Sequence, residues 1–291
     1  MKIDNSLPER IVSPADHSAI ESAAQRFETP CGDGAIIWHT WGTGIPVVLL
    51  HGGSGSWTHW VRNIRNLVAN GYHVLIPDLP GFGDSANPPD GQDADVMPRW
   101  LEAGLASLID NASCRLVGFS FGAMVATLWA ASYPRRVSQL IMVGAPALSQ
   151  KKMPRVGLRG WDHLPDGNER TAIHRHNLMA LMLARTKSVD ELSLALHAAN
   201  LERDRLKRRR LAKTDIVVRT LPQVHCPVSG IWGARDAVYS DRIDTIEPGL
   251  STAPGYRSLS FIPNSGHWTQ YEDAELFDDL LCAELRQLPV S

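Results

Sequence analysis

The stretch Gly118-Phe119-Ser120-Phe121-Gly122 reads G-x-S-x-G and lies between two segments of different character. The run before it, 114–117, predicts the end of a buried strand, and residues 123–133 are rich in helix formers until Pro134. The flanking glycines permit a sharp turn that would leave the Ser120 hydroxyl exposed above a sheet. Since a serine hydroxyl alone is a weak nucleophile, such a site needs a base, a group that orients the base, and donors for an oxyanion.

Strands and helices alternate on both sides of this turn. This alternation predicts an α/β fold, with a mostly parallel sheet covered by helices on both faces. Two adjacent strands, 35–41 and 46–50, are predicted to open the sheet. Further strands are predicted at 72–77, 137–143, 228–232 and 257–262, and helices at 57–70, 96–109, 241–250 and 273–288.

The alternation stops after Gly144-Ala145-Pro146, and the chain then has helical periodicity without a convincing strand until about Pro222. This segment predicts an inserted helical cap. We therefore expect three parts: the first part of an α/β core at 1–146, the cap at 147–222, and the second part of the core at 223–291. Residues 1–20 are expected to form an N-terminal extension.

Composition excludes several classes of partner and location. Of the 291 residues, 44% are hydrophobic and 21% charged, with a net charge of −2, as in an ordinary globular protein. This charge balance predicts neither nucleic acid nor a membrane surface as partner. The polar N-terminus has no apolar signal-peptide core, and no apolar run approaches the ~20 residues that span a bilayer.

The four cysteines have no C-x-x-C spacing of a zinc or redox site, so we expect them to be reduced and mostly buried: Cys31, Cys114, Cys226 and Cys282. These features predict a cytoplasmic protein. Its partner is expected to be a small-molecule substrate. The sequence leaves open whether the chain forms a homo-oligomer.

Two further residues can complete a site around Ser120. Asp236 ends Gly233-Ala234-Arg235-Asp236, directly after the strand predicted at 228–232. His267 lies in Asn264-Ser265-Gly266-His267-Trp268, directly after the next strand. The carboxyl ends of parallel strands meet at one edge of the sheet, where open α/β sheets place their sites. The order Ser, Asp, His is that of enzymes built on this strand-to-helix turn.

The sequence resembles the capped enzymes of the α/β-hydrolase fold, which include small-molecule esterases, lactonases, perhydrolases and hydrolases of carbon–carbon bonds in aromatic breakdown products. The resemblance covers roughly residues 35–287. It rests on four ordered pieces: His51-Gly52-Gly53, Asp78-Leu79-Pro80-Gly81-Phe82-Gly83-Asp84-Ser85, Gly118-Phe119-Ser120-Phe121-Gly122 and Gly266-His267-Trp268.

On this basis Ser120 would be the nucleophile, His267 the base, and Asp236 the residue that orients His267. The backbone N–H groups of Phe121 and Gly53 would hold the oxyanion. In the family the acid can also follow the strand before the cap, but this chain has Gly144-Ala145-Pro146 there. Neither a cofactor nor a metal ion is expected.

Several residues have alternative readings. Ser120 could mark an incidental turn, His267 could be structural, and Asp236 could be a helix N-cap. Asp78 and Asp84 lie in a turn-forming loop and are left outside the catalytic set. The triplet at 174–176, His174-Arg175-His176, lacks the spacing of a zinc site, so a structural or cap-lining role is favoured.

Two groups could contact substrate. The run Glu202–Lys213 contains seven basic residues and is predicted to be a solvated cap helix, although one of its arginines could reach the cleft and hold a substrate carboxylate. An aromatic pocket could form from Trp57, Trp60 and Trp268 together with Phe119. Trp268, Phe119 and Trp57 are assigned to the site as substrate-binding residues, and core packing is an equal alternative for Trp57 and Trp60.

These observations favour a serine hydrolase that cleaves a small carboxylic ester or lactone through an acyl-enzyme. The alternative is hydrolysis of a carbon–carbon bond in a dioxo-acid ring-cleavage product, because the segment 266–272 resembles the end of those enzymes. They tend to carry Asn where this chain has Phe119, which ranks the alternative second. A non-catalytic binder on the same fold is a third possibility, but the complete set of Ser, Asp and His disfavours it.

Overall fold

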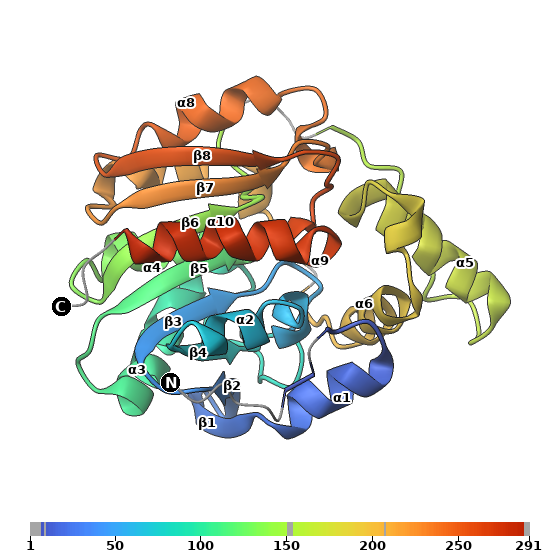
Figure 1. The fold of residues 1–291 in the computed structure, drawn as a ribbon, viewed down its shortest axis with the longest axis horizontal. Coiled ribbons are helices and arrows are strands. Elements are labelled where there is room, and N and C mark those ends of the chain that lie inside the picture. The colour runs from blue at the N-terminus through green and yellow to red at the C-terminus, as the bar shows by residue number, and fades with distance from the viewer. Residues whose placement is uncertain (1–6, 9, 150–153, 207, 288–291) are drawn as a thin grey trace.

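A computed structural model describes residues 7–8, 10–149, 154–206 and 208–287. In this part of the chain, eight strands form one sheet in the order β1-β2-β4-β3-β5-β6-β7-β8. All neighbours from β4 to β8 are parallel, whereas β1 with β2 and β2 with β4 are antiparallel. Helices cover both faces of the sheet, with α2 and α10 in front and α3 and α4 behind in Figure 1. The predicted α/β fold is confirmed.

The strands follow the prediction closely, with two differences. Strand β1 was not predicted, and β4 lies between β2 and β3, so the first two predicted strands are not neighbours in the sheet. The bounds are β1 Gln25–Cys31, β2 Gly34–Trp41, β3 Ile45–Leu50, β4 Tyr72–Pro77, β5 Cys114–Phe119, β6 Val137–Val143, β7 Val228–Gly233 and β8 Tyr256–Ile262.

Several predicted helices are shorter or divided. The one predicted at 57–70 consists of a 3-10 turn, η1 (Trp57–Trp60), followed by α2. The helices are α1 Pro14–Ser22, α2 Ile64–Ala69, α3 Met97–Ile109, α4 Phe121–Ser132, α5 Asn168–Asn177, α6 Glu191–Glu202, α7 Ile216–Thr220, α8 Ile246–Leu250, α9 Thr269–Glu272 and α10 Ala274–Arg286.

The hydrophobic core has two layers, one on each face of the sheet. Alternate residues of β3 divide between them: Val48 and Leu50 face the layer that contains α4, whereas Val47 and Leu49 face the layer that contains α10. Side chains of a strand point alternately to opposite faces, so a strand that is apolar throughout must be covered on both. This explains why β3 is an unbroken apolar run.

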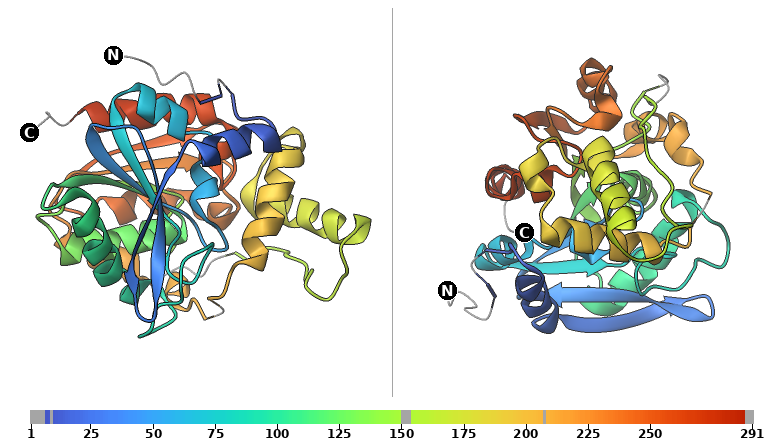
Figure 2. Two further views of the ribbon diagram at one scale, coloured as in Figure 1. Left: turned by 90° about the horizontal axis from the view of Figure 1, so that it is seen from below. Right: turned by 90° about the vertical axis from the view of Figure 1, so that its right-hand side faces the viewer.

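A mostly helical segment joins β6 to β7 and lies beyond the edge where the parallel strands end (Figures 1 and 2). It contains α5, a π-helical turn η3 (Leu178–Met182), α6 and α7. The basic run is not the predicted solvated helix: α6 ends at Glu202, and the only helical turn before α7 is the 3-10 turn η5 (Leu211–Lys213) among the described residues. Its arginines instead contact loops of the core, as described below.

Four predicted stretches extend outside the described residues. These are the start of the N-terminal extension (1–6 and 9), part of the cap (150–153), Lys207 of the basic run, and Leu288 at the end of the final helix.

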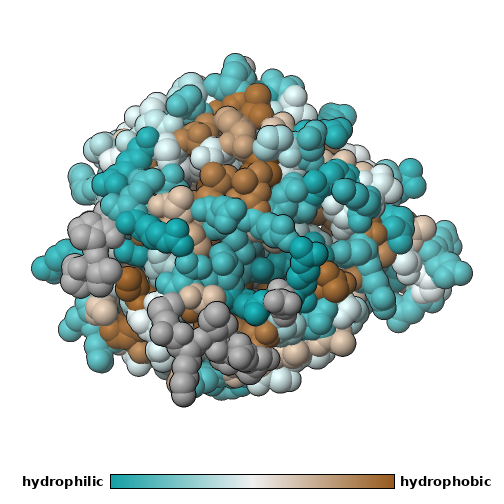
Figure 3. Space-filling model, in the orientation of Figure 1, coloured by the Kyte–Doolittle hydropathy of each residue, from teal (hydrophilic) through white to brown (hydrophobic). Residues whose placement is uncertain are grey.

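No helix among the described residues is long and apolar enough to cross a membrane. On the face shown in Figure 3, hydrophilic residues predominate and hydrophobic ones gather in patches. Phe261 of β8 and Leu276 of α10 are among the exposed apolar side chains of the described chain, at 40% and 44%. Isolated exposed apolar residues of this kind are normal in globular proteins.

Candidate active site

Ser120 lies at a sharp turn between β5 and α4. Its φ of 50° and ψ of −116° are unusual for a residue with a side chain and hold it in a strained conformation. The turn is possible because Gly118 and Gly122 allow close packing: a Cβ at Gly118 would stand 2.5 Å from Ala123 Cα, and one at Gly122 would stand 2.4 Å from the His51 oxygen. Ser120 is left partly exposed, as the motif predicts.

The structure brings the three residues proposed from the sequence together. His267 Nε2 lies 2.9 Å from Ser120 Oγ, and His267 Nδ1 lies 2.8 Å from Asp236 Oδ2. The other carboxylate oxygen, Asp236 Oδ1, accepts a hydrogen bond from the Val238 N–H at 2.8 Å. Asp236 therefore both caps a short turn and binds His267. The two roles considered for Asp236, as a helix N-cap and as the residue that orients His267, are therefore compatible.

Phe119 and Gly144 both border the His267 ring. Phe119 is fully buried, and its ring centroid lies 5.0 Å from that of His267. Gly144 directly follows β6 with a φ of +56°, and a Cβ there would stand 3.0 Å from the His267 ring. The absence of a side chain at Gly144 leaves room for the imidazole ring. A larger residue would strain the backbone and crowd the ring.

The glycine-rich loop after β3 is fixed by two buried histidines. His51 Nε2 accepts a hydrogen bond from the Leu79 N–H at 2.8 Å, so the proton lies on Nδ1, which donates to the Gly52 oxygen. His59 Nδ1 accepts a hydrogen bond from the Gly52 N–H at 3.2 Å. Burial lowers the pKa of His51 to about 4 and that of His59 well below its ordinary value. Both rings are therefore neutral near pH 7.

Glu272 joins the His267 loop to the segment between β6 and β7. Its side chain is fully buried and accepts hydrogen bonds from three backbone N–H groups, those of Ala184, Arg185 and Gly266. In addition, the Trp268 N–H donates to the Met182 oxygen at 2.7 Å. The residues on either side of His267 are thus tied to the chain just after the turn η3.

The aromatic candidates divide between the site and the core. Trp57 has His17, His39 and Trp41 as its ring neighbours, which places it in the core rather than beside Ser120. Trp268 is buried, stacks on Tyr271 at 4.2 Å, and donates from Nε1 to the His59 oxygen. Trp60 packs against Phe119 and Phe277. Contact of Trp268 and Phe119 with substrate stays a prediction.

The residues set aside from the catalytic set have structural contacts. Asp78 is buried and accepts from the N–H groups of Trp57 and Asp84, and burial raises the pKa of its carboxyl to about 6. His176 Nε2 bonds to the Gly157 oxygen, and His174 packs on Trp161.

No cluster of three or more potential metal ligands occurs in the described part of the chain. All four cysteines are free and three are buried, as predicted.

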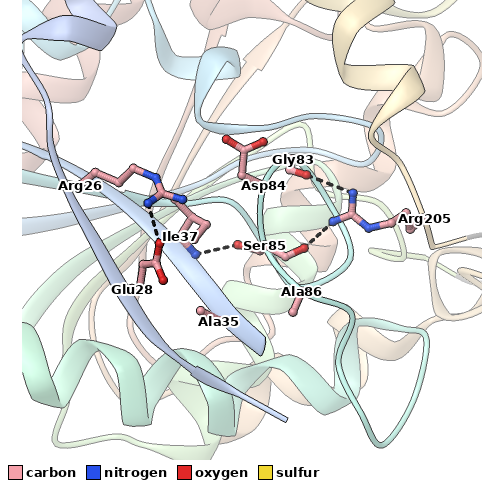
Figure 4. A pocket seen from close by; sticks show the side chains of 9 residues that line it. All are labelled: Arg26, Glu28, Ala35, Ile37, Gly83, Asp84, Ser85, Ala86 and Arg205. Atoms are coloured by element: carbon pink, nitrogen blue, oxygen red, sulfur yellow. Dashed lines mark hydrogen bonds and ion pairs between the residues drawn. The ribbon is translucent and has the colours of Figure 1, made fainter. Parts of the chain in front are cut away.

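The arginines of the basic run contact the core. Arg205 donates to the backbone oxygens of Gly83 and Ser85 at the rim of an open surface pocket of about 440 Å³, beside the Arg26–Glu28 pair (Figure 4). Ser120 is not among the residues that line this pocket. Arg203 pairs with Asp84 at 3.1 Å. Arg209 alone of these three reaches the glycine-rich loop, where its Nη2 lies 3.2 Å from Ser54 Oγ.

Sequence reasoning missed the supporting roles of Gly144, His59 and Glu272. Gly144 follows a predicted strand at the same sheet edge as Ser120, and this placement could have identified it. Glu272 and His59 gave no such signal, because each acts on backbone groups that only the folded chain brings near.

Comparisons with known proteins agree with this architecture. A model of the α/β-hydrolase fold family matches residues 45–218. The chain is similar to a 2-hydroxy-6-oxo-6-phenylhexa-2,4-dienoate hydrolase of Burkholderia cepacia, with 32% identity over 82% of this chain and 87% of that protein. It is also similar to a 2-hydroxy-6-oxononadienedioate/2-hydroxy-6-oxononatrienedioate hydrolase of Cupriavidus pinatubonensis, with 31% identity over 90% of this chain and 95% of that protein.

Solved structures show the same fold. A meta-cleavage product hydrolase from Pseudomonas fluorescens superposes with a TM-score of 0.74 at 20% identity, covering 90% of this chain and 97% of that one. An esterase from a Rhodococcus species superposes with a TM-score of 0.73 at 21% identity, covering 91% and 99%. From the family match, which spans more than half of the residues, and from these relatives, the chain belongs to the α/β-hydrolase fold family and is a hydrolase.

Proposed function

We propose that this hydrolase cleaves a small carboxylic ester or lactone through an acyl-enzyme formed on Ser120. One observation carries the proposal: the continuous line of hydrogen-bonding atoms from Ser120 Oγ through both nitrogens of His267 to Asp236. Of these residues only Ser120 is partly exposed, while His267 and Asp236 are 3% and 1% exposed. A substrate can thus reach the nucleophile while the base and its partner stay shielded from water.

In the first step, Ser120 Oγ forms a bond to the carbonyl carbon while its proton passes to His267 Nε2, and the carbonyl electrons move to the oxygen. The tetrahedral intermediate then expels the alcohol oxygen, which takes the proton from His267. Water, deprotonated by His267, releases the acid in the same way. Asp236 stabilises the charged imidazole and keeps Nε2 directed at Ser120.

The oxyanion would be held by the backbone N–H groups of Phe121 and Gly53. Phe121 is the first residue of α4, so its N–H has no partner four residues earlier within the helix. The positive end of the helix dipole favours negative charge at this position. A Cβ at Gly53 would stand 3.6 Å from Phe121 Cβ, so the two residues border the same space.

Carbon–carbon bond hydrolysis is the second candidate, favoured by the names of the relatives reported above. The feature that still ranks ester cleavage first is Phe119. This position packs an apolar ring directly against His267 and Gly52, where the carbon–carbon hydrolases are expected to carry an amide.

The segment between β6 and β7 is proposed to act as a cap over the site, and a small organic molecule is the proposed partner. A cytoplasmic location is part of the same proposal, supported by the free thiols of all four cysteines.

Replacement of Ser120 by Ala tests the nucleophile. We expect the variant to lose turnover of a short-chain aryl ester, because the acyl-enzyme cannot form, while thermal unfolding stays close to that of the parent protein. A fluorophosphonate probe should label the parent at Ser120 and leave the variant unlabelled. Comparable turnover by both proteins, or labelling elsewhere, would exclude the assignment.

The bond that is cleaved requires a direct comparison. The parent protein is assayed side by side on a short-chain aryl ester and on a yellow dioxo-acid ring-cleavage product, and kcat/KM is compared. We expect the ester to have the higher value. A much higher value for the dioxo-acid would reverse the ranking while leaving the role of Ser120 intact.

A further inference from the structure

Arg209 carries an unused hydrogen-bond donor beside the proposed oxyanion site. Its Nη1 is buried and has no hydrogen-bond partner among the described residues. A Cβ at Gly53 would stand 3.1 Å from this nitrogen and 3.6 Å from Phe121 Cβ. The guanidinium therefore borders the two residues whose N–H groups are proposed to bind the oxyanion. A buried donor without an acceptor is destabilising, so its presence calls for a reason.

The remainder of the guanidinium is firmly held. Nη2 lies 3.0 Å from Asp204 Oδ2 and 3.2 Å from Ser54 Oγ, and the same Asp204 oxygen accepts the Ser54 hydroxyl at 2.5 Å. The Arg209 Cζ also lies 5.4 Å from the centre of the Phe82 ring. Nη2 is thus held by Asp204 and Ser54, and Nη1, the other terminal nitrogen of the planar group, lies beside Gly53.

The backbone on both sides of Arg209 is attached to the core. Before it, the Arg205 N–H donates to the Gly81 oxygen, and the Arg205 side chain binds the loop after β4 (Figure 4). After it, the N–H groups of Arg210 and Leu211 donate to Asp93 Oδ2. These contacts join the segment between β6 and β7 to loops more than a hundred residues away. They hold the backbone of Arg209 in position relative to the core.

We propose that Arg209 is a catalytic residue that donates a third hydrogen bond, from Nη1, to the oxyanion formed on the substrate carbonyl. The inference rests on the proposed function. When the Ser120 Oγ–carbon bond forms and the carbonyl electrons move to oxygen, Arg209 keeps all its protons and stabilises the new negative charge. A charged donor fixed in advance is about twice as strong as a neutral one and requires no reorganisation during the reaction.

A substrate carboxylate is the competing acceptor for Nη1. Asp204 argues against it, because its carboxylate already offsets the charge of Arg209 at 3.0 Å. The pair is close to neutral as a whole, which weakens attraction for a full anion in the ground state. A donor with an adjacent carboxylate is better suited to an oxygen whose charge develops only in the transition state.

Replacement of Arg209 by Gln or Lys tests the inference, with Arg208→Gln as the matched control because Arg208 is the exposed neighbour. Turnover is measured on a neutral aryl ester and on an aryl ester whose acyl chain ends in a carboxylate. We expect both Arg209 variants to lower kcat by about 10²-fold on both esters with little change in KM, as for the loss of one oxyanion donor. The control should match the parent protein.

The rate at which a fluorophosphonate labels Ser120 gives a second measurement, since the phosphonyl oxygen occupies the oxyanion position. We expect slower labelling in both Arg209 variants. The Lys variant keeps a cation beside Asp204, so it remains informative if the Gln variant fails to fold. An unchanged kcat and labelling rate, or a loss confined to the carboxylate ester, would overturn the inference. If the parent protein is not labelled at Ser120, the proposed function fails instead.

Discussion

The hydrogen bond between Asp236 and His267 decides which nitrogen of the imidazole carries the proton. Asp236 Oδ2 lies 2.8 Å from Nδ1, and an ionised carboxylate can only accept. Nδ1 therefore carries the proton, and Nε2 is left with a lone pair directed at Ser120 Oγ, 2.9 Å away. The proposed role of His267 as a base therefore depends on the position of a single acceptor atom, Asp236 Oδ2.

Replacement of Asp236 by Asn should reverse this arrangement. The Asn amide would keep an oxygen for the Val238 N–H but present NH₂ to Nδ1, which favours the tautomer with its proton on Nε2. We expect kcat on an aryl ester to fall by about 10⁴-fold with nearly unchanged thermal unfolding. Asp241→Asn, at an exposed position on the same loop, is the control. Retention of a tenth or more of the activity would contradict the role of Asp236.

At the scale of elements, the buried carboxylate of Glu272 is a main link between the His267 loop and the chain that follows η3, beside the hydrogen bond from the Trp268 N–H to the Met182 oxygen. Glu272 accepts from the N–H of Gly266 at 2.7 Å and from that of Arg185 at 2.8 Å. The segment between β6 and β7 and the loop that carries the base are therefore positioned together. Any movement of the segment near Ala184 would be felt at Gly266, the residue before His267.

Glu272→Gln tests this connection. A Gln side chain has one acceptor oxygen and would direct its NH₂ at a backbone N–H, leaving a buried donor without a partner at a cost of about 1–3 kcal/mol. We expect the midpoint of thermal unfolding to fall by several degrees and kcat to fall with it. Glu275→Gln should change neither, because Glu275 pairs with Arg10 at the surface with an 85% exposed side chain. Equal behaviour of the two variants would refute the connection.

At the scale of the whole molecule, buried histidines link stability to pH. Burial lowers the pKa values of His39, His51 and His197 to about 4. These neutral rings stabilise the folded state fully above the unfolded pKa of about 6.5, and that stability is lost as pH falls toward 4. Asp78 acts in the opposite sense. Its raised pKa of about 6 stabilises the fold at low pH, and this contribution is lost as pH rises.

His59 acts with these three histidines, while burial also raises the pKa of Asp278, which acts with Asp78. Because the histidines with lowered pKa values outnumber these two carboxyls, we expect stability to fall between pH 6.5 and pH 4. Across this range the unfolded chain binds protons at these histidines that the folded protein does not bind, so lowering the pH favours unfolding. The free energy of urea unfolding, measured at pH 7, 6, 5 and 4 at constant ionic strength, checks the expectation. A value that stays constant or rises toward pH 4 would show that the buried histidines do not control acid stability.

Local signals were enough to predict the alternating strands and helices, the turn at Ser120, and the order of Ser120, Asp236 and His267. Periodicity, glycine placement and position after a strand act over a few residues, so they can be read along the chain. The tertiary structure alone decided that β4 lies between β2 and β3, that Trp57 packs in the core, and that the basic run is not a helix. It also placed Arg209 beside Gly53 and Glu272 beside Gly266 and Arg185. Most of these contacts join residues far apart in sequence, and they depend on which buried polar groups find partners once the sheet has formed.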